Sequence, residues 1–130
     1  TMKSMEESRF SHKEEQNRKR YQEEGLLEQE WRRMKAYYPR RAAAVQAAVE
    51  DACDRLDYEG SFLFDEHPDP WTVRRTCQDI CRQLNGRKNI QAMAVLREDL
   101  PKDSLSDLTQ ALFCQEMHRR RCRRKRLKRI

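Results

Sequence analysis

The chain has 130 residues, 37% of them hydrophobic and 38% charged, so it is long enough for one domain with a modest core. Residues 119–130 hold nine of the 28 Lys and Arg and none of the 22 Asp and Glu, which leaves 19 basic against 22 acidic residues elsewhere. No window approaches the ~18 apolar residues of a membrane span, and the first thirty residues lack the apolar core of a secretory signal. We therefore expect a cytoplasmic protein with no membrane span.

The N-terminal part of the chain is almost entirely polar, with charges of both signs interleaved. We expect residues 1–24 to form a charged N-terminal arm, either a solvated helix or a disordered segment. After Gly25, apolar residues recur at steps of four, three and four, which predicts a helical stripe that stops before Pro39. This stripe consists of Leu27, Trp31, Met34 and Tyr38.

A second helix is predicted after Pro39, because the missing N–H of proline suits the first turn of a helix. Its apolar residues share one face and its charged residues lie largely off that face. Gly60 is a natural stop, so we expect the helix to end near Tyr58. The predicted core face consists of Ala42, Val45, Val49, Ala52, Cys53 and Leu56.

Residues 58–70 read as a loop because they contain one Gly and two Pro, although residues 62–64 form the apolar run Phe-Leu-Phe. We expect so apolar a loop to pack on the body of the protein. Asp69 before Pro70 places an N-cap acceptor beside a proline at the first helical position, which predicts the start of a third helix. Its predicted core face consists of Val73, Cys77, Ile80, Cys81 and Leu84, and Asn85-Gly86 closes it.

The end of the chain predicts one further helix. Residues 87–103 fit either a short helix or a loose connection. The fourth helix is expected near Ser104, where Ser-Leu-Ser-Asp resembles a capping box, and it runs directly into the basic segment. Its stripe consists of Leu105, Leu108, Leu112 and Met117.

These patterns predict an all-α fold, because they include no internal repeat, no strand-like alternation and no sustained heptad. We expect a small helical bundle of about four helices. The domains would be the charged arm at 1–24, a helical domain at 25–118 and an Arg-rich tail at 119–130.

The Arg-rich tail concentrates positive charge, and a phosphate backbone would relieve its self-repulsion while releasing counterions. Arg outnumbers Lys by seven to two in the tail, which favours bidentate phosphate contacts. The run alone does not choose between RNA, DNA, anionic lipid and an acidic protein surface, and the alternative is a solubilising terminus. The predicted polyanion-binding residues are Arg119, Arg120, Arg121, Arg123, Arg124, Lys125, Arg126, Lys128 and Arg129.

Cysteine and acidic residues supply two weaker candidates for chemistry. Cys77 and Cys81 are an i, i+4 pair on one predicted helix, and Cys114 and His118 on another, so the four could hold a structural zinc if the helices pack face to face. As core cysteines they would instead act as small hydrophobes, and we expect no metal and no cofactor. The loop 65–69 gathers three carboxylates and an imidazole, but no nucleophile pair, phosphate cradle or second acidic cluster accompanies it. We therefore expect no enzyme.

Three aromatic residues are candidates for a partner-binding surface if they are exposed: Phe62, Phe64 and Trp71. Anchoring of the core and the loop is the alternative role for these side chains.

The motifs Tyr38-Pro39, Cys53-Asp-Arg-Leu-Asp-Tyr-Glu-Gly-Ser61 and Asp65-Glu-His-Pro-Asp69, with the Arg-rich end Gln115–Arg124, resemble an uncharacterised family of small proteins from clostridial gut bacteria. The resemblance covers about residues 37–84 and 105–126. It implies a bacterial source and a class of protein, and no activity. At the position of His118 we expect members of that family to carry an aromatic residue more often, which disfavours the zinc site.

The sequence thus predicts a non-enzymatic helical binding protein whose Arg-rich tail binds a polyanion, namely the backbone of RNA or DNA. The alternative is a protein-interaction or assembly factor that uses the apolar loop 58–71 to contact a partner or a second copy of the chain, as a homo-oligomer. In that case the tail only adds solubility or steers encounter. A third possibility is a zinc-containing or catalytic domain built on the four Cys and His residues or on the loop 65–69.

Overall fold

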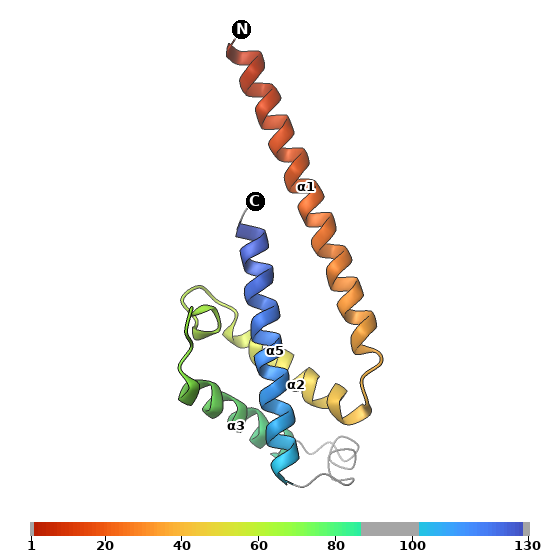
Figure 1. The fold of residues 1–130 in the computed structure, drawn as a ribbon, viewed down its shortest axis with the longest axis vertical. Coiled ribbons are helices and arrows are strands. Elements are labelled where there is room, and N and C mark those ends of the chain that lie inside the picture. The colour runs from red at the N-terminus through yellow and green to blue at the C-terminus, as the bar shows by residue number, and fades with distance from the viewer. Residues whose placement is uncertain (1, 87–101, 129–130) are drawn as a thin grey trace. The chain divides into compact units, whose positions relative to one another are not determined.

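The computed structural model describes residues 2–86 and 102–128 (Figure 1). Within these ranges there are four α-helices, one short 3-10 helix and no strand, which confirms the all-α prediction. The helices are α1 (Met2–Lys35), α2 (Arg40–Leu56), η1 (Phe62–Phe64), α3 (Pro70–Gly86) and α5 (Lys102–Lys128). The segment 87–101, for which a short helix or a connection was expected, lies outside the described residues.

The chain divides into two compact units, one of Thr1–Ala36 with Cys122–Ile130 and one of Tyr37–Arg121. These divisions differ from the expected boundaries after residues 24 and 118, because both of those positions lie inside continuous helices. The helix α5 contributes to both units.

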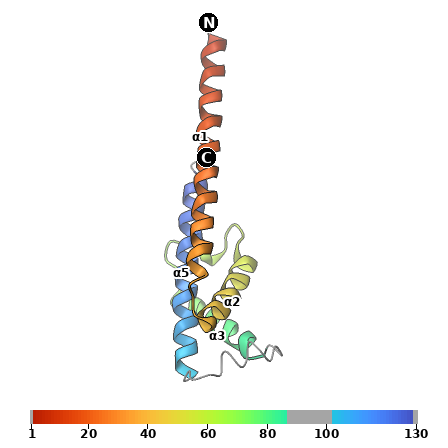
Figure 2. The same cartoon turned by 90° about the vertical axis from the view of Figure 1, so that its right-hand side faces the viewer.

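The helix α1 runs without a break through Gly25, where the arm was expected to end (Figure 2). Glycine costs about 1 kcal/mol in a helix interior, and the Glu, Gln, Lys, Arg and Leu residues around it are good helix formers. The predicted stripe after Gly25 is largely uncovered, since Leu27 is 43% and Met34 is 55% exposed. Leu27, Trp31 and Met34 lie in α1 as predicted, and none of them belongs to the hydrophobic core. Tyr38 lies beyond the end of α1 at Lys35, so the helical prediction is wrong there, and its side chain packs against the core.

The helix α2 begins directly after Pro39, whose carbonyl oxygen accepts a hydrogen bond from the Ala43 N–H at 2.9 Å. It ends at Leu56, two residues before the expected end near Tyr58. Gly60 then has a φ of +87°, a left-handed conformation that glycine adopts without the usual steric cost. The turn is closed by the Ser61 N–H, which donates to the Tyr58 carbonyl at 3.1 Å.

The apolar loop packs on the body, as predicted. The Ser61 hydroxyl accepts a hydrogen bond from the Leu63 N–H at 3.3 Å and so starts the single turn η1. Leu63 is completely buried, and the Phe62 ring stacks on Phe113 with 6.5 Å between ring centroids.

The start of α3 is also as predicted, because the Asp69 carboxylate caps it. Asp69 Oδ2 accepts hydrogen bonds from the Thr72 N–H at 3.1 Å and from the Thr72 hydroxyl at 3.0 Å. These bonds satisfy one of the amide groups that the first turn of a helix leaves without a partner.

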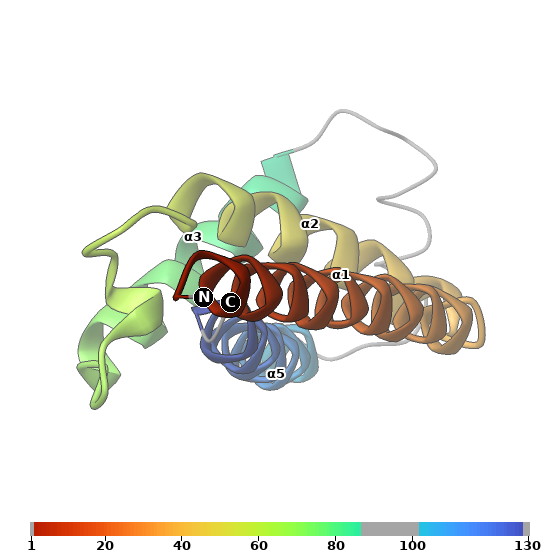
Figure 3. The same ribbon diagram turned by 90° about the horizontal axis from the view of Figure 1, so that it is seen from above.

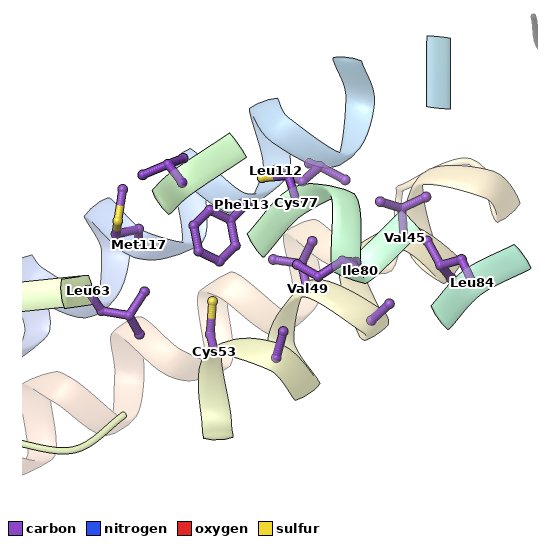
Figure 4. Close-up of a cluster of buried hydrophobic side chains, with 13 residues drawn as sticks. Val45, Val49, Cys53, Leu63, Cys77, Ile80, Leu84, Leu112, Phe113 and Met117 are labelled. Carbon is purple, nitrogen blue, oxygen red and sulfur yellow. The ribbon is translucent and has the colours of Figure 1, made fainter. Parts of the chain in front are cut away.

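The core of the second unit lies between α2, α3 and α5, with Leu63 of η1 at one side (Figure 4). The helices α2 and α3 lie side by side (Figure 3). The predicted core faces are largely confirmed, although Cys81 is only half-buried. Sequence patterns missed Phe113, which is completely buried among the other core side chains. The core consists of Val45, Ala48, Val49, Ala52, Cys53, Leu63, Val73, Cys77, Ile80, Leu84, Leu112, Phe113 and Met117.

The helix α5 begins at Lys102, so Ser104 lies inside the helix and does not cap its start as expected. In the sequence a proline directly precedes Lys102, which favours a helix start there. The buried face of α5 is not purely apolar, because Thr109 and Glu116 are both fully buried on it. The Thr109 hydroxyl donates to the Leu105 carbonyl at 2.7 Å, and the Cys81 thiol donates to the same hydroxyl at 3.4 Å.

Candidate functional site

The Arg-rich tail is helical wherever the structure describes it. Residues 119–128 continue α5 without a break, and Arg129 lies outside the described residues. A helix sorts its side chains onto faces by their 3.6-residue repeat, so the cations of one run can have different surroundings. Each cation of the tail therefore has its own surroundings.

The first two arginines of the tail contact a buried carboxylate. Glu116 has no exposed side-chain surface and accepts two hydrogen bonds from Arg119, at 2.8 and 3.1 Å. It accepts a third from Arg120 at 2.9 Å and a longer one from the Gln46 amide at 3.4 Å. The buried charge is thus both neutralised and hydrogen-bonded, as a charge removed from water requires.

Arg120 also connects α5 to α2. Its side chain is only 12% exposed, and it donates to Asp54 Oδ1 at 2.7 Å and to Asp57 Oδ2 at 3.1 Å. A guanidinium group that contacts three carboxylates (those of Glu116, Asp54 and Asp57) holds the end of α2 against α5. Arg120 therefore has a structural role and is not available to an outside ligand.

The pKa shifts of Glu116 and Arg120 agree with a structural role for this ion pair. Burial by itself raises the pKa of Glu116, but the hydrogen bonds and charges of Arg119 and Arg120 outweigh it and hold the pKa below its ordinary value. Burial likewise lowers the pKa of Arg120, but its hydrogen bonds to Glu116 and Asp54 raise it to above the ordinary value. Glu116 and Arg120 are therefore both charged in the folded protein at neutral pH.

Two further arginines pair with α1 inside the first unit. Arg126 donates hydrogen bonds to both carboxylate oxygens of Glu24, the one from Nη2 at 3.3 Å. Arg123 Nη1 lies 3.9 Å from Glu28 Oε1. Glu24 is buried, whereas the Arg123 and Arg126 side chains are nearly half exposed, so these pairs are partly open to water.

The remaining cations follow another face of α5. Arg121, Lys125 and Lys128 recur at steps of four and three, and we call these three residues the outward stripe. Lys125 and Lys128 are exposed and Arg121 is half-buried. None of the three forms an ion pair with any residue of the described ranges 2–86 and 102–128. By helical register Arg124 lies beside this stripe, where it is half-buried and makes contacts of its own. The predicted polyanion-binding set is thus divided into paired arginines and the outward stripe.

The three predicted partner-binding residues also differ in their surroundings. Phe62 and Phe64 are half-buried and pack against the core, whereas Trp71 on α3 is 61% exposed. Of the three predicted partner-binding residues, Trp71 is therefore the one whose side chain is exposed.

Trp71 belongs to a hollow on the outer face of α3 with a volume of about 320 Å³. The Arg75 guanidinium lies 5.3 Å from the centroid of the Trp71 ring. Arg82 Nη1 is 3.5 Å from Asp79 Oδ1, and both side chains are well exposed. We call the six lining residues the α3 patch: Trp71, Arg74, Arg75, Gln78, Asp79 and Arg82.

The structure does not bring the possible zinc ligands together. In the part of the chain that the structure describes, no three His, Cys, Asp or Glu side chains are grouped so that they could hold a metal ion. Cys77 is buried, whereas Cys114 and His118 are exposed. Burial, with smaller contributions from Cys114 and Cys81, raises the pKa of the Cys77 thiol to about 12, which disfavours the thiolate that zinc requires.

The acidic loop 65–69 has a local structural explanation. Asp69 caps α3, and the Asp65 N–H donates to the Phe62 carbonyl at 3.1 Å and closes η1. Both bonds are local, and none of the residues 65–69 lines the hollow on the outer face of α3.

No family model, curated protein or solved structure matches the chain. Among the described helices, none contains a stretch long and apolar enough to cross a membrane.

Proposed function

We propose that the protein is a non-enzymatic binding protein and that the outward stripe of α5 binds the phosphate backbone of a nucleic acid. The observation that carries the proposal is that Arg121, Lys125 and Lys128 share a face of α5 and form no ion pair with the described residues. Four other arginines of the tail are engaged by Glu116, Asp54, Glu24 and Glu28, namely Arg119, Arg120, Arg123 and Arg126.

The spacing of the outward stripe suits a run of phosphates. Seven residues of α-helix separate Arg121 from Lys128, which is roughly 10 Å at a rise of 1.5 Å per residue. A duplex presents one phosphate about every 3.4 Å along each strand, so three cations on this face can each meet a different phosphate. Contacts of this kind supply affinity without sequence readout.

Removal of the whole tail would not test the proposal. A chain that ends at His118 would lose Arg119 and Arg120 and leave Glu116 buried without its charge partners. The loss of binding could then reflect unfolding. Substitutions on the outward stripe avoid this problem because its side chains make no such contact.

The test compares two triple variants with equal changes in net charge. The first carries Arg121→Gln, Lys125→Gln and Lys128→Gln. The matched control carries Arg9→Gln, Lys13→Gln and Lys19→Gln, which neutralise one Arg and two Lys that are exposed on α1. Binding of labelled single-stranded RNA and of duplex DNA is followed by fluorescence anisotropy across several salt concentrations.

We expect the outward-stripe variant to bind roughly 10-fold or more weakly at low salt. Its plot of log affinity against log salt for duplex DNA should be shallower by about 2 to 3, since each lost phosphate contact contributes about 0.9. The matched control should keep the slope of the unmodified chain. Equal losses in both variants would show that net charge alone drives binding, and no binding by the unmodified chain at low salt would sink the proposal.

A further inference from the structure

The α3 patch occupies the face of α3 that the fold does not use. Its six residues recur at steps of three and four from position 71 to position 82. The opposite face of the same helix carries the buried Val73, Cys77, Ile80 and Leu84. Trp71 is neither in the hydrophobic core nor among the partly buried residues packed against it, and its side chain is 61% exposed.

The chemistry of the patch combines a flat aromatic ring with a surplus of cations. It holds three arginines and a single carboxylate, that of Asp79. The pair between Arg82 and Asp79 is exposed on both sides, so water screens it and a stronger anion can replace it. Arg75 lies over the Trp71 ring, which places a cation beside a stacking surface.

We propose that the α3 patch is a binding site for unpaired nucleic acid, with one base stacked on Trp71 and the neighbouring phosphates held by Arg74, Arg75 and Arg82. The proposal depends on the proposed function for the class of polyanion. It adds a second contact and names the form of the ligand, a single strand.

The preference for a single strand follows from the aromatic ring. In a duplex the bases are stacked on one another and paired, whereas an unpaired strand can offer a base face to a ring. Arg74 and Arg82 are eight residues apart, roughly 12 Å along the helix, so they can meet different phosphates of the same strand. An acidic peptide could use the arginines but would leave the indole without a flat partner.

The test uses the indole fluorescence of Trp71 in the full chain. Trp31→Phe removes the other tryptophan, so that emission comes from Trp71 alone. This variant is titrated with a single-stranded oligonucleotide, with the duplex of the same sequence and with polyglutamate. We expect the single strand to quench the emission, and the duplex and polyglutamate to leave it nearly unchanged.

A second measurement compares Trp71→Leu with Tyr58→Leu, an exposed aromatic residue outside the patch. Stacking of one base predicts that Trp71→Leu weakens single-strand binding by about 5-fold to 100-fold. Binding to the duplex should change by less than about 2-fold, and Tyr58→Leu should resemble the unmodified chain.

The outcomes separate the two proposals. If Trp71→Leu binds the single strand normally while the outward-stripe variant does not, the α3 patch is refuted and the function of α5 stands. Equal losses on the single strand and the duplex refute the preference for unpaired nucleic acid. Quenching by polyglutamate alone refutes the assignment and indicates an acidic protein partner. Absence of nucleic-acid binding by the unmodified chain refutes both proposals.

Discussion

Arg120 and Arg121 are neighbours in the sequence but have different surroundings. Arg120 is 12% exposed and contacts the carboxylates of Glu116, Asp54 and Asp57. Arg121 forms no ion pair with any residue that the structure describes. The same residue type therefore forms ion pairs within the fold at one position and none with the described residues at the next, and helical register accounts for the difference.

The largest expected effect is on stability. Arg120→Gln should lower the free energy of unfolding by about 3 to 5 kcal/mol, because it leaves buried Glu116 with fewer charge partners and releases α2 from α5. Arg121→Gln should change it by less than about 0.5 kcal/mol. Urea unfolding of the two variants beside the unmodified chain measures the difference, and similar values would contradict the division of roles.

A smaller effect concerns Glu116 itself. Glu116→Gln should lower the free energy of unfolding by about 2 to 3 kcal/mol at neutral pH. The substitution removes the negative charge that accepts three hydrogen bonds from Arg119 and Arg120.

The same carboxylate predicts a pH dependence. Its pKa is depressed in the folded chain, so its stabilisation is complete above the ordinary carboxyl pKa near 4.3. It is lost as the pH falls through the lower folded pKa. Thermal unfolding between pH 6 and pH 3 should show a steeper decline for the unmodified chain than for Glu116→Gln. Parallel curves would mean that Glu116 is not the group responsible.

If α5 binds nucleic acid as proposed, two carboxylates on α1 should weaken this binding, because they hold two of its arginines. Replacement of both Glu24 and Glu28 with Gln releases Arg126 and Arg123, and we expect the dissociation constant for duplex DNA to fall roughly 2-fold to 5-fold at low salt. The free energy of unfolding should fall by about 1 to 3 kcal/mol, because Glu24 is buried and accepts two hydrogen bonds from Arg126. The matched control is Glu14→Gln with Glu15→Gln, which alters the net charge equally on an exposed part of α1. If both double variants gained the same affinity for duplex DNA, the gain would be due to the change in net charge.

The smallest effect is a difference in thiol reactivity. Burial raises the pKa of the Cys53 and Cys77 thiols to about 12, so both should alkylate slowly at pH 7.5. Cys114 is exposed and shares the helical face of Arg121, seven residues further along α5. Mass spectrometry of the alkylated chain should find Cys114 modified first and more slowly when nucleic acid is bound. An unchanged rate at Cys114 with ligand bound would place the ligand on another face.

Local sequence signals predicted most of the fold. Pro39, the Asp69-Pro70 pair and the apolar faces of α2 and α3 each carry a signal within a few residues, and the structure confirms them. The extent of helix α1 was harder to predict. Gly25 suggested a helix boundary, but the helix continues through it because the surrounding residues are good helix formers.

The division of the tail was not predicted, because it depends on contacts between distant residues. The pair of Arg120 with Asp54 spans 66 positions and that of Arg126 with Glu24 spans 102. One signal was present, since the stripe of Leu105, Leu108 and Leu112 reaches Glu116 and then Arg120 when it is extended at helical steps. A charged residue on such a stripe indicates a buried ion pair. The outer face of α3 carried a signal as well, in the steps of three and four that join Trp71 to its arginines.

The engagement of the paired arginines has a consequence for reagents made from this protein. A synthetic peptide of residues 119–130 would display all nine cations to solvent, whereas the folded chain holds Arg119, Arg120, Arg123 and Arg126 against carboxylates. The peptide would also lack the helix that aligns the outward stripe, because so short a segment is only marginally helical in water. Transplanted to another protein, the run would behave as a generic polycation, because it would lose both the carboxylates that engage four of its arginines and the helical register that sorts its cations onto faces.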